Sequence, residues 1–511
     1  MITLKRKLLK SLLCLLLLTG TKLSAEVKLP AFFSDHMVLQ RDMSVPIWGT
    51  AKDGEKITVS FQDQNVSTTA SNGRWMVRLN PLKAGGPFEL KVIGENTVTV
   101  GDVLVGEVWI CSGQSNMGRG LGPQAGQKVI VNWEQEVASA NYPQIRHFAV
   151  KYNPSDKPMA DVAGQWVICS PQTAAKFTAV GYYFGRDLHR KLGVPIGLMH
   201  TSLGGSPVEA WTRHEPLTQL FPDIVASHEK AVANYPAALE KFKADEPKLL
   251  ADWEKATLDA KAAGKPQPHK PEPPKDPAKS ETRNSSLYNG MVAPLIPYAM
   301  RGVIWYQGEA NAGRAKQYQK LFSSMIGDWR SQWNEGTFPF LFVQVAPYKE
   351  MNAEIREAQF LTWQSIPQTA MVVITDHGDA NDVHPAEKEP VGDRLALAAR
   401  AIAYKENIEY SGPVFEKLTV NGSQAVLSFS HLAGGLLAKD GPLKGFQIAG
   451  ADGHFVPADA TIEGDTVVVT NKDVPAPVSV TYGWTNVPDI NLFNKEGLPA
   501  SPFRSNPPPV R

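Results

Sequence analysis

The chain has 511 residues, of which 43% are hydrophobic and 20% are charged, and its formal net charge is +1. This length exceeds what one hydrophobic core usually serves, so two or three domains are expected. The near-neutral charge gives no support for a nucleic-acid partner, because such partners select for clustered lysine and arginine.

The first 25 residues predict a secretory signal peptide. Four basic residues within 5–10 precede an apolar run at 12–18, and small residues follow at 24–25. The run is too short for a stable membrane span, so cleavage is favoured over an uncleaved anchor. Cleavage removes five of the 52 basic residues and no acid, which leaves 47 against 51 and a net charge of about −4. We expect an exported protein, periplasmic or secreted.

Cysteine use excludes a disulfide framework in this exported chain. Cleavage leaves Cys111 and Cys169, which either pair with one another or remain as two buried thiols. No cysteine and histidine cluster has the spacing of a structural zinc site.

Residues 26–104 predict a small β-sandwich. Short segments of alternating and β-branched residues are separated by turns rich in Gly, Asn and Asp. They lie at 47–51, 56–62, 73–80, 88–95 and 96–105.

Residues 105–407 predict an α/β domain. Nearly continuous apolar runs, typical of strands covered on both faces, lie at 106–111, 195–201, 302–307, 338–346 and 370–376. Helix-like segments lie at 180–192, 315–333, 353–364 and 391–404. This alternation predicts a three-layer α/β/α arrangement around a parallel sheet. An insertion at 228–282 has a helical part and a loop rich in Pro and Lys.

Residues 408–511 predict a second β-rich region. Short strands are expected at 417–422, 424–430, 445–450, 466–471 and 478–484. This region either stands alone or packs with the N-terminal strands.

Polar residues follow four of the predicted α/β strands. Ligands gather beyond the carboxyl ends of strands in such sheets, so these residues are expected at one rim. They are Ser115, the pair Gly204 and Gly205, the group Gln307, Glu309 and Asn311, and the segment 376–384.

Ser115 lies on a sharp strand-to-helix turn between the amides Gln114 and Asn116. Such a turn exposes the hydroxyl and directs backbone N–H groups toward the same point. The spacing differs from G-x-S-x-G, because Met117 occupies the place of the second glycine. Spacing alone favours a nucleophile and a helix-capping serine equally.

His384 is the candidate general base, because its imidazole titrates near neutral pH and can carry the serine proton. His377, directly after Asp376, is the nearest rival. We favour His384, because the helix predicted to begin near Pro390 would hold its loop against the rim.

Three motifs resemble a known family. GQSNM at 113–117, WYQGEAN at 305–311 and DVHP at 382–385 are similar, in this order, to the sialate O-acetylesterase family of carbohydrate esterases. That family belongs to the wider serine–glycine–asparagine–histidine hydrolases. The segments 33–42 and 491–504 also resemble it, so the resemblance covers nearly the whole mature chain.

The resemblance implies that Ser115 is the nucleophile and His384 its base. The wider superfamily places aspartate three residues before the histidine, whereas position 381 is Asn and Asp382 stands two residues before. The pattern of the sialate esterases and related acetylxylan esterases is Asp-x-His, which Asp382 fits. It also places the QGE glutamate, here Glu309, at the catalytic centre. Both acids therefore remain candidates for orienting His384.

Ester cleavage requires donors for a developing oxyanion. The candidates are the backbone N–H groups of Ser115 and Gly205, with Gly204 as an alternative, and the side chain of Gln307, where the superfamily uses asparagine. The glycines could equally serve only a tight turn.

Substrate contacts are expected near the rim. Trp211 and Tyr306 are candidates for stacking on a sugar, with core packing as the alternative. Arg213 is a candidate for pairing with a sugar carboxylate, with a role as an ordinary surface residue as the alternative. The other candidates are the amides of Gln114, Asn116 and Asn311.

The resemblance implies a serine esterase that removes O-acetyl groups from carbohydrate, with O-acetylated sialic acid as substrate. It implies neither a metal nor an organic cofactor. The alternatives are an acetylxylan or hemicellulose acetylesterase and, from another class, a non-catalytic carbohydrate-binding protein. The intact set of candidate residues argues against the binding protein. A metal-dependent N-deacetylase is disfavoured, because the histidines lack a ligand set.

Overall fold

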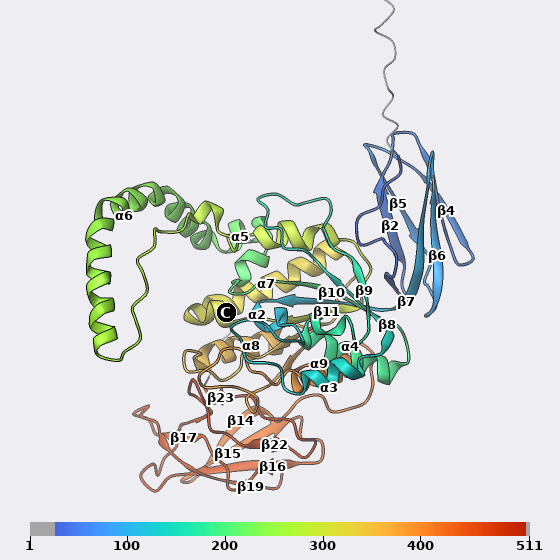
Figure 1. Ribbon diagram of the computed structural model, residues 1–511. Helices are drawn as coiled ribbons and strands as arrows, with labels where there is room; N and C mark the ends of the chain where they lie inside the picture. Colours follow the sequence, from blue (N-terminus) through green and yellow to red (C-terminus); the bar gives the residue numbers. More distant parts are fainter. Residues whose placement is uncertain (1–25, 507–511) are drawn as a thin grey trace, which may run out of the picture.

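The computed structural model describes residues 26–506, so the predicted signal peptide at 1–25 lies outside the described residues. An α/β region occupies the centre, with a β-rich region from the N-terminal part on one side and another from the C-terminal part on a different side (Figure 1). Within residues 26–506, no helix combines the length and apolar character that a membrane span requires.

The N-terminal region is joined to the centre by one long strand, β7 (Thr97–Gly113). Its first part pairs antiparallel with β6, and its last part pairs parallel with strands of the central sheet. The strand therefore runs through position 104–105, where the sequence suggested a domain boundary. The preceding strands are β1 (Val38–Gln40), β2 (Val45–Thr50), β3 (Lys56–Phe61), β4 (Gln64–Thr69), β5 (Arg74–Leu79) and β6 (Gly85–Ile93).

The central sheet has the strand order β13-β12-β11-β7-β10-β8-β9. All neighbours are parallel except β9, which runs antiparallel to β8 at the edge, so the sheet is mixed where the sequence predicted a parallel one. Its other strands are β8 (Tyr142–Ala149), β9 (Trp166–Cys169), β10 (Ile196–Ser202), β11 (Gly302–Tyr306), β12 (Phe340–Val343) and β13 (Thr369–Val372).

Helices cover both faces of this sheet. Alternate residues of β7 face opposite sides of the sheet: Trp109 packs against Phe184 of α4 (Ala179–Leu192), whereas Ile110 belongs to the core on the other face. On that other face, Trp305 of β11 stacks on Phe322 of α7 (Ala315–Trp333). The predicted three-layer α/β/α fold is thereby confirmed. Its helices are α2 (Ser115–Gly118), α3 (Trp133–Ser139), α4 (Ala179–Leu192), α5 (His214–Leu220), α7 (Ala315–Trp333), α8 (Ala353–Ser365) and α9 (Glu389–Ile402).

The insertion forms the long helix α6 (Pro222–Ala262), which curves away from the body of the molecule (Figure 1). The chain returns alongside it as an extended segment, and the Trp253 indole donates to the Pro268 carbonyl at 2.9 Å. Ile224, near the start of α6, is its single buried residue.

The C-terminal region has its own core, whose buried residues all lie within 425–503. It packs against the central domain rather than the N-terminal strands (Figure 1), and Arg504 bonds Glu357 of α8 at 2.7 Å. Its strands are β14 (Val414–Asn421), β15 (Gln424–Ser430), β16 (Leu436–Ala438), β17 (Phe446–Ala449), β18 (Val456–Pro457), β19 (Asp459–Glu463), β20 (Thr466–Thr470), β21 (Ser479–Tyr482), β22 (Leu492–Asn494) and β23 (Phe503–Arg504).

Cys111 and Cys169 are both buried free thiols, so the structure has no disulfide between them. Of the two arrangements that the sequence left open, the structure has the unpaired one.

Candidate active site

The register of three strands brings distant segments to one place. Gly113, the last residue of β7, lies opposite Ser202 at the end of β10 and Tyr306 at the end of β11. A Cβ atom at Gly113 would lie 2.2 Å from the Tyr306 carbonyl oxygen, and its φ is +134°. Only glycine permits this backbone approach. The segments that follow the three strands therefore begin side by side at the carboxyl edge of the sheet.

Ser115 and His384 meet at this edge. Ser115 begins α2, and His384 lies in the loop between β13 and α9. The Ser115 Oγ lies 2.8 Å from the His384 Nε2, although 269 positions separate the residues in sequence. This contact is the one that an activated serine nucleophile requires.

Asp382 is the carboxylate that lies beside His384. Its Oδ1 accepts a hydrogen bond from the His384 backbone N–H at 2.8 Å and lies 3.7 Å from the imidazole Nδ1. The second distance is too long for a hydrogen bond but short enough to stabilise a protonated ring. Among the described residues, Glu309 forms no bond to His384; its Oε1 accepts from the Asn116 amide at 2.6 Å. The two candidate acids therefore hold different positions.

Asn116 ties three segments of the site together. Its Nδ2 donates to Glu309 and, at 3.0 Å, to the Val383 carbonyl next to His384. Its Oδ1 accepts from the Lys388 ammonium at 2.6 Å. The side chain is fully buried, so the expectation that Asn116 contacts substrate is replaced by an internal role. The polar side chain is used to join the Ser115 turn to the His384 loop.

Lys388 is a site residue that the sequence analysis missed. It directly precedes α9 and is 1% exposed. A lysine at a helix start is ordinarily a solvated surface residue, and its position four residues after His384 was the only sequence feature that pointed to it. Its burial depends on packing that sequence does not show.

Burial shifts the pKa values of His384 and of the ionisable groups around it. It lowers the pKa of Lys388 to about 7, with the Arg119 guanidinium adding to the effect. It also lowers the pKa of His384 below its ordinary value, and the Lys388 charge lowers it further. Burial raises the pKa of Glu309. His384 is therefore neutral at neutral pH, the form that accepts a proton.

The loop that carries the candidate glycines reaches the serine at Gly204. A Cβ atom at Gly204 would lie 3.5 Å from the Ser115 Cβ, so this glycine is the nearer of the pair. Gly205 has a φ of +68°, a backbone conformation that by itself accounts for a glycine at this position. Within the described residues, the N–H groups of Ser115, Gly204 and Gly205 donate to no other backbone group.

Gln307 does not have the free amide expected of an oxyanion donor. It is fully buried, and its Nε2 donates to the Ser206 carbonyl at 3.2 Å and to the Asn311 Oδ1 at 2.8 Å. Both N–H groups are thereby committed within the protein. The structure corrects the expectation, because Gln307 joins two loops beneath the rim.

The two aromatic candidates for sugar stacking are core residues. Trp211 and Tyr306 are both fully buried, so neither presents a ring face to a ligand. The Trp211 indole donates to Ser206 at 2.8 Å and its ring packs edge-on against Trp305. The Lys388 ammonium lies over the Tyr306 ring, 5.2 Å from the ring centroid. Core packing, the alternative stated for both, is what the structure shows.

The remaining polar candidates are also bonded internally. The Asn311 amide donates to Glu209 at 2.9 Å. Arg213 pairs with Asp328 at 2.9 Å, so its guanidinium is already engaged within the protein. Gln114 accepts two backbone N–H groups through its Oε1, and within residues 26–506 its Nε2 has no acceptor. Of these three, only Gln114 keeps a donor free for a ligand.

His377, the rival base, belongs to a different cluster. Its Nδ1 bonds Glu387, and its Nε2 lies 3.3 Å from Asp376, which Arg394 also pairs. Within residues 26–506, no group of three or more His, Cys, Asp or Glu side chains is arranged to hold a metal ion.

Comparison with known proteins places this chain in a family. The model of a family of carbohydrate esterases described as sialic acid-specific acetylesterases matches residues 105–243 and 278–400. The unmatched stretch falls in α6 and the chain returning along it. The chain is 31% identical to the rat sialate O-acetylesterase and 30% identical to that of mouse. Each alignment covers 93% of both chains.

A solved structure agrees with these matches. A carbohydrate acetylesterase from Xanthomonas citri is 37% identical, with a TM-score of 0.78, over 94% of this chain and 100% of that one. Sequence relatives and fold thus lead to the same group of enzymes. The chain belongs to the sialic acid-specific acetylesterase family of carbohydrate esterases and is a carboxylic ester hydrolase.

Proposed function

We propose that this chain removes O-acetyl groups from sialic acid by nucleophilic catalysis at Ser115. The observation that carries the mechanism is the 2.8 Å contact between the Ser115 Oγ and the His384 Nε2. Sialic acid as the sugar is supported by the family match and by the relatives named sialate O-acetylesterase.

In the first half of the reaction, neutral His384 takes the Ser115 proton while Oγ attacks the acetyl carbonyl carbon. The carbonyl oxygen becomes an oxyanion facing the N–H groups of Ser115 and Gly204. The intermediate collapses, the C–O bond to the sugar breaks, and His384 returns its proton to the departing sugar hydroxyl. An acetyl ester on Ser115 remains.

In the second half, His384 takes a proton from water, whose oxygen attacks the acetyl-enzyme. Collapse releases acetate, and the proton returns to Ser115. Asp382 stabilises the imidazolium formed in each half, and its 3.7 Å separation from Nδ1 is expected to shorten when that charge develops.

A panel of substrates tests which acetylated sugar the enzyme prefers. Acetate release is measured with O-acetylated sialic acid and with acetylated xylan fragments. The proposal expects faster release from sialic acid, and preference for xylan fragments would make the chain a hemicellulose acetylesterase.

A matched pair of variants tests the nucleophile. Ser115→Ala should lower acetate release by about 10⁴-fold or more, because the acetyl-enzyme cannot form. His377→Gln, at the histidine outside the site, should release acetate at the wild-type rate. Equal turnover by Ser115→Ala and wild type would refute the serine mechanism.

A further inference from the structure

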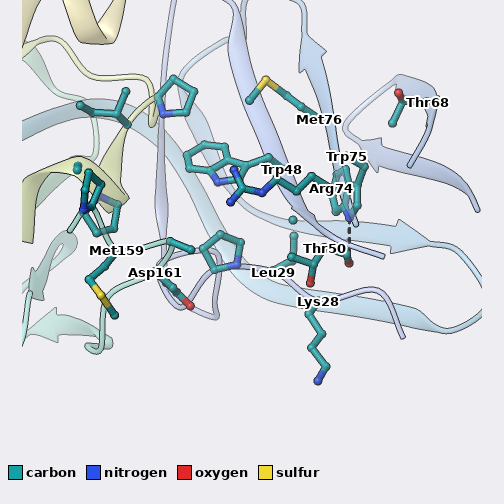
Figure 2. A pocket seen from close by; sticks show the side chains of 18 of the residues that line it. Lys28, Leu29, Trp48, Thr50, Thr68, Arg74, Trp75, Met76, Met159 and Asp161 are labelled. Carbon is teal, nitrogen blue, oxygen red and sulfur yellow. Dashed lines mark hydrogen bonds between the residues drawn. The ribbon is translucent and has the colours of Figure 1, made fainter. Parts of the chain in front are cut away.

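A groove of about 750 Å³ lies between the N-terminal β region and the central domain. Figure 2 shows Trp48, Arg74 and Met76 on one side of this groove and Met159 and Asp161 on the other. Its volume and its place at a domain junction are typical of small-molecule sites. It shares no lining residue with the Ser115 site.

One wall of the groove consists of outward-facing side chains of the strands β2 and β5. In the antiparallel pair β2 and β5, Trp48 lies opposite Met76 and Thr50 lies opposite Arg74. Alternate residues of a strand share a face, so these four side chains form one platform. The intervening residues of both strands are buried, which fixes the outward direction of the platform.

The platform presents apolar surface to solvent. Met76 is 40% exposed and Met159 across the groove is 42% exposed. Trp48 is partly exposed and is fixed from behind by Phe33, whose ring centroid is 4.8 Å away. Exposed apolar surface rimmed by polar groups marks a ligand groove, and a rigid aromatic face matches the C–H face of a sugar ring.

Two cationic side chains of the groove lining, Lys28 and Arg74, have no carboxylate partner among the described residues. The Asp161 carboxylate is engaged by the backbone N–H groups of Ala31 and Val162, at 3.0 and 2.7 Å. A guanidinium free to form two parallel hydrogen bonds selects a carboxylate.

We propose that this groove binds an oligosaccharide that carries a carboxylate sugar, as a site separate from the catalytic one. The assignment rests on the proposed function for the choice of carbohydrate as ligand. Pro297, in the lining, precedes β11, so the groove lies toward the amino end of a strand whose carboxyl end leads into the active site. The groove therefore retains the glycan chain, while Ser115 acts elsewhere on it.

Calorimetric titration of the full chain with 3′-sialyllactose, which has no acetyl ester, tests the groove. Lactose is the neutral comparison. Sialyllactose should bind at least about tenfold more tightly than lactose, because only it offers a carboxylate to Arg74. Equal affinity for the two sugars, or no binding of sialyllactose, would overturn the proposal.

Variants locate the binding. Arg74→Gln should weaken sialyllactose binding by about tenfold. Arg78→Gln is the matched control, because Arg78 is exposed on the same face of β5 but outside the groove lining. Trp48→Ala should weaken both sugars, with circular dichroism to verify its fold. Unchanged affinity in Arg74→Gln would refute the groove as the site.

The two proposals fail separately. If the groove proposal is wrong, wild type still releases acetate from O-acetylated sialic acid. If the proposed function is wrong, that release is absent while sialyllactose binding and its loss in Arg74→Gln persist.

Discussion

Replacing Asn116 with alanine removes the side chain that joins the Ser115 turn to the loop of His384. Two of its bonds, to Glu309 and from Lys388, involve charged partners at 2.6 Å, and the third, to the Val383 carbonyl, is neutral at 3.0 Å. Alanine leaves a buried ammonium and a buried carboxyl group without this partner. The change therefore affects both stability and catalysis.

The magnitude follows from these bonds. A hydrogen bond to a charged group contributes about 1.5 kcal/mol at the low end and a neutral one about 1 kcal/mol, so we expect Asn116→Ala to lower the free energy of unfolding by about 4 kcal/mol. With its loop released, His384 loses its alignment on Ser115. A displacement of the order of 1 Å lowers kcat by about 10²-fold. KM should change little, because buried Asn116 cannot contact substrate.

Urea unfolding followed by tryptophan fluorescence measures the stability change, and nitrophenyl acetate hydrolysis separates kcat from KM. Asn289→Ala is the matched control, because Asn289 is also buried but, within residues 26–506, its side chain donates a single neutral bond, to the Ser155 carbonyl at 3.2 Å. It should cost about 1 kcal/mol and leave kcat unchanged. An Asn116→Ala protein no less stable than this control, with wild-type kcat, would refute the reasoning.

Two further predictions concern the imidazole and the turn before the serine. Because burial and Lys388 lower the pKa of His384 from its ordinary 6.5, kcat/KM should stay on its plateau until the pH falls through that lowered value. Lys388→Met removes a positive charge and should move this acid limb to higher pH, whereas Asp382→Asn removes a negative charge and should move it to lower pH, as pH profiles of kcat/KM would show. Gly113→Ala forces a Cβ against the Tyr306 carbonyl and should cost more than about 2 kcal/mol in unfolding free energy, with loss of hydrolysis.

A specific result would contradict each of these two predictions. Shifts of the acid limb in one direction for both variants would show that the two charges do not act on His384. For the turn, Gly126→Ala is the control, because Gly126 also has a positive φ, of +74°, but no atom within 4 Å of an added Cβ. If Gly113→Ala and Gly126→Ala were equally stable, the close approach of the two strands would be irrelevant.

Strand and helix positions were accessible from the sequence because they depend on local periodicity. The predicted helix at 315–333 coincides with α7, and the predicted strand at 302–307 ends one residue beyond β11. β8 was missed, because its buried Arg146 breaks the apolar run. That arginine is compensated by Asp102, at 2.7 Å, from a strand 44 positions away. A pattern within one segment cannot show such a partner.

By itself, the sequence determined the order of the elements and, through its three motifs, identified Ser115 and His384 as the candidate catalytic pair. Only the tertiary structure decided that Asp382 lies beside the imidazole, that Glu309 bonds Asn116, and that Trp211 belongs to the core. Local sequence fixes backbone conformation, because that depends on neighbours along the chain. The burial and bonding of a side chain depend on which distant segments pack against it, and this is decided when the whole chain folds.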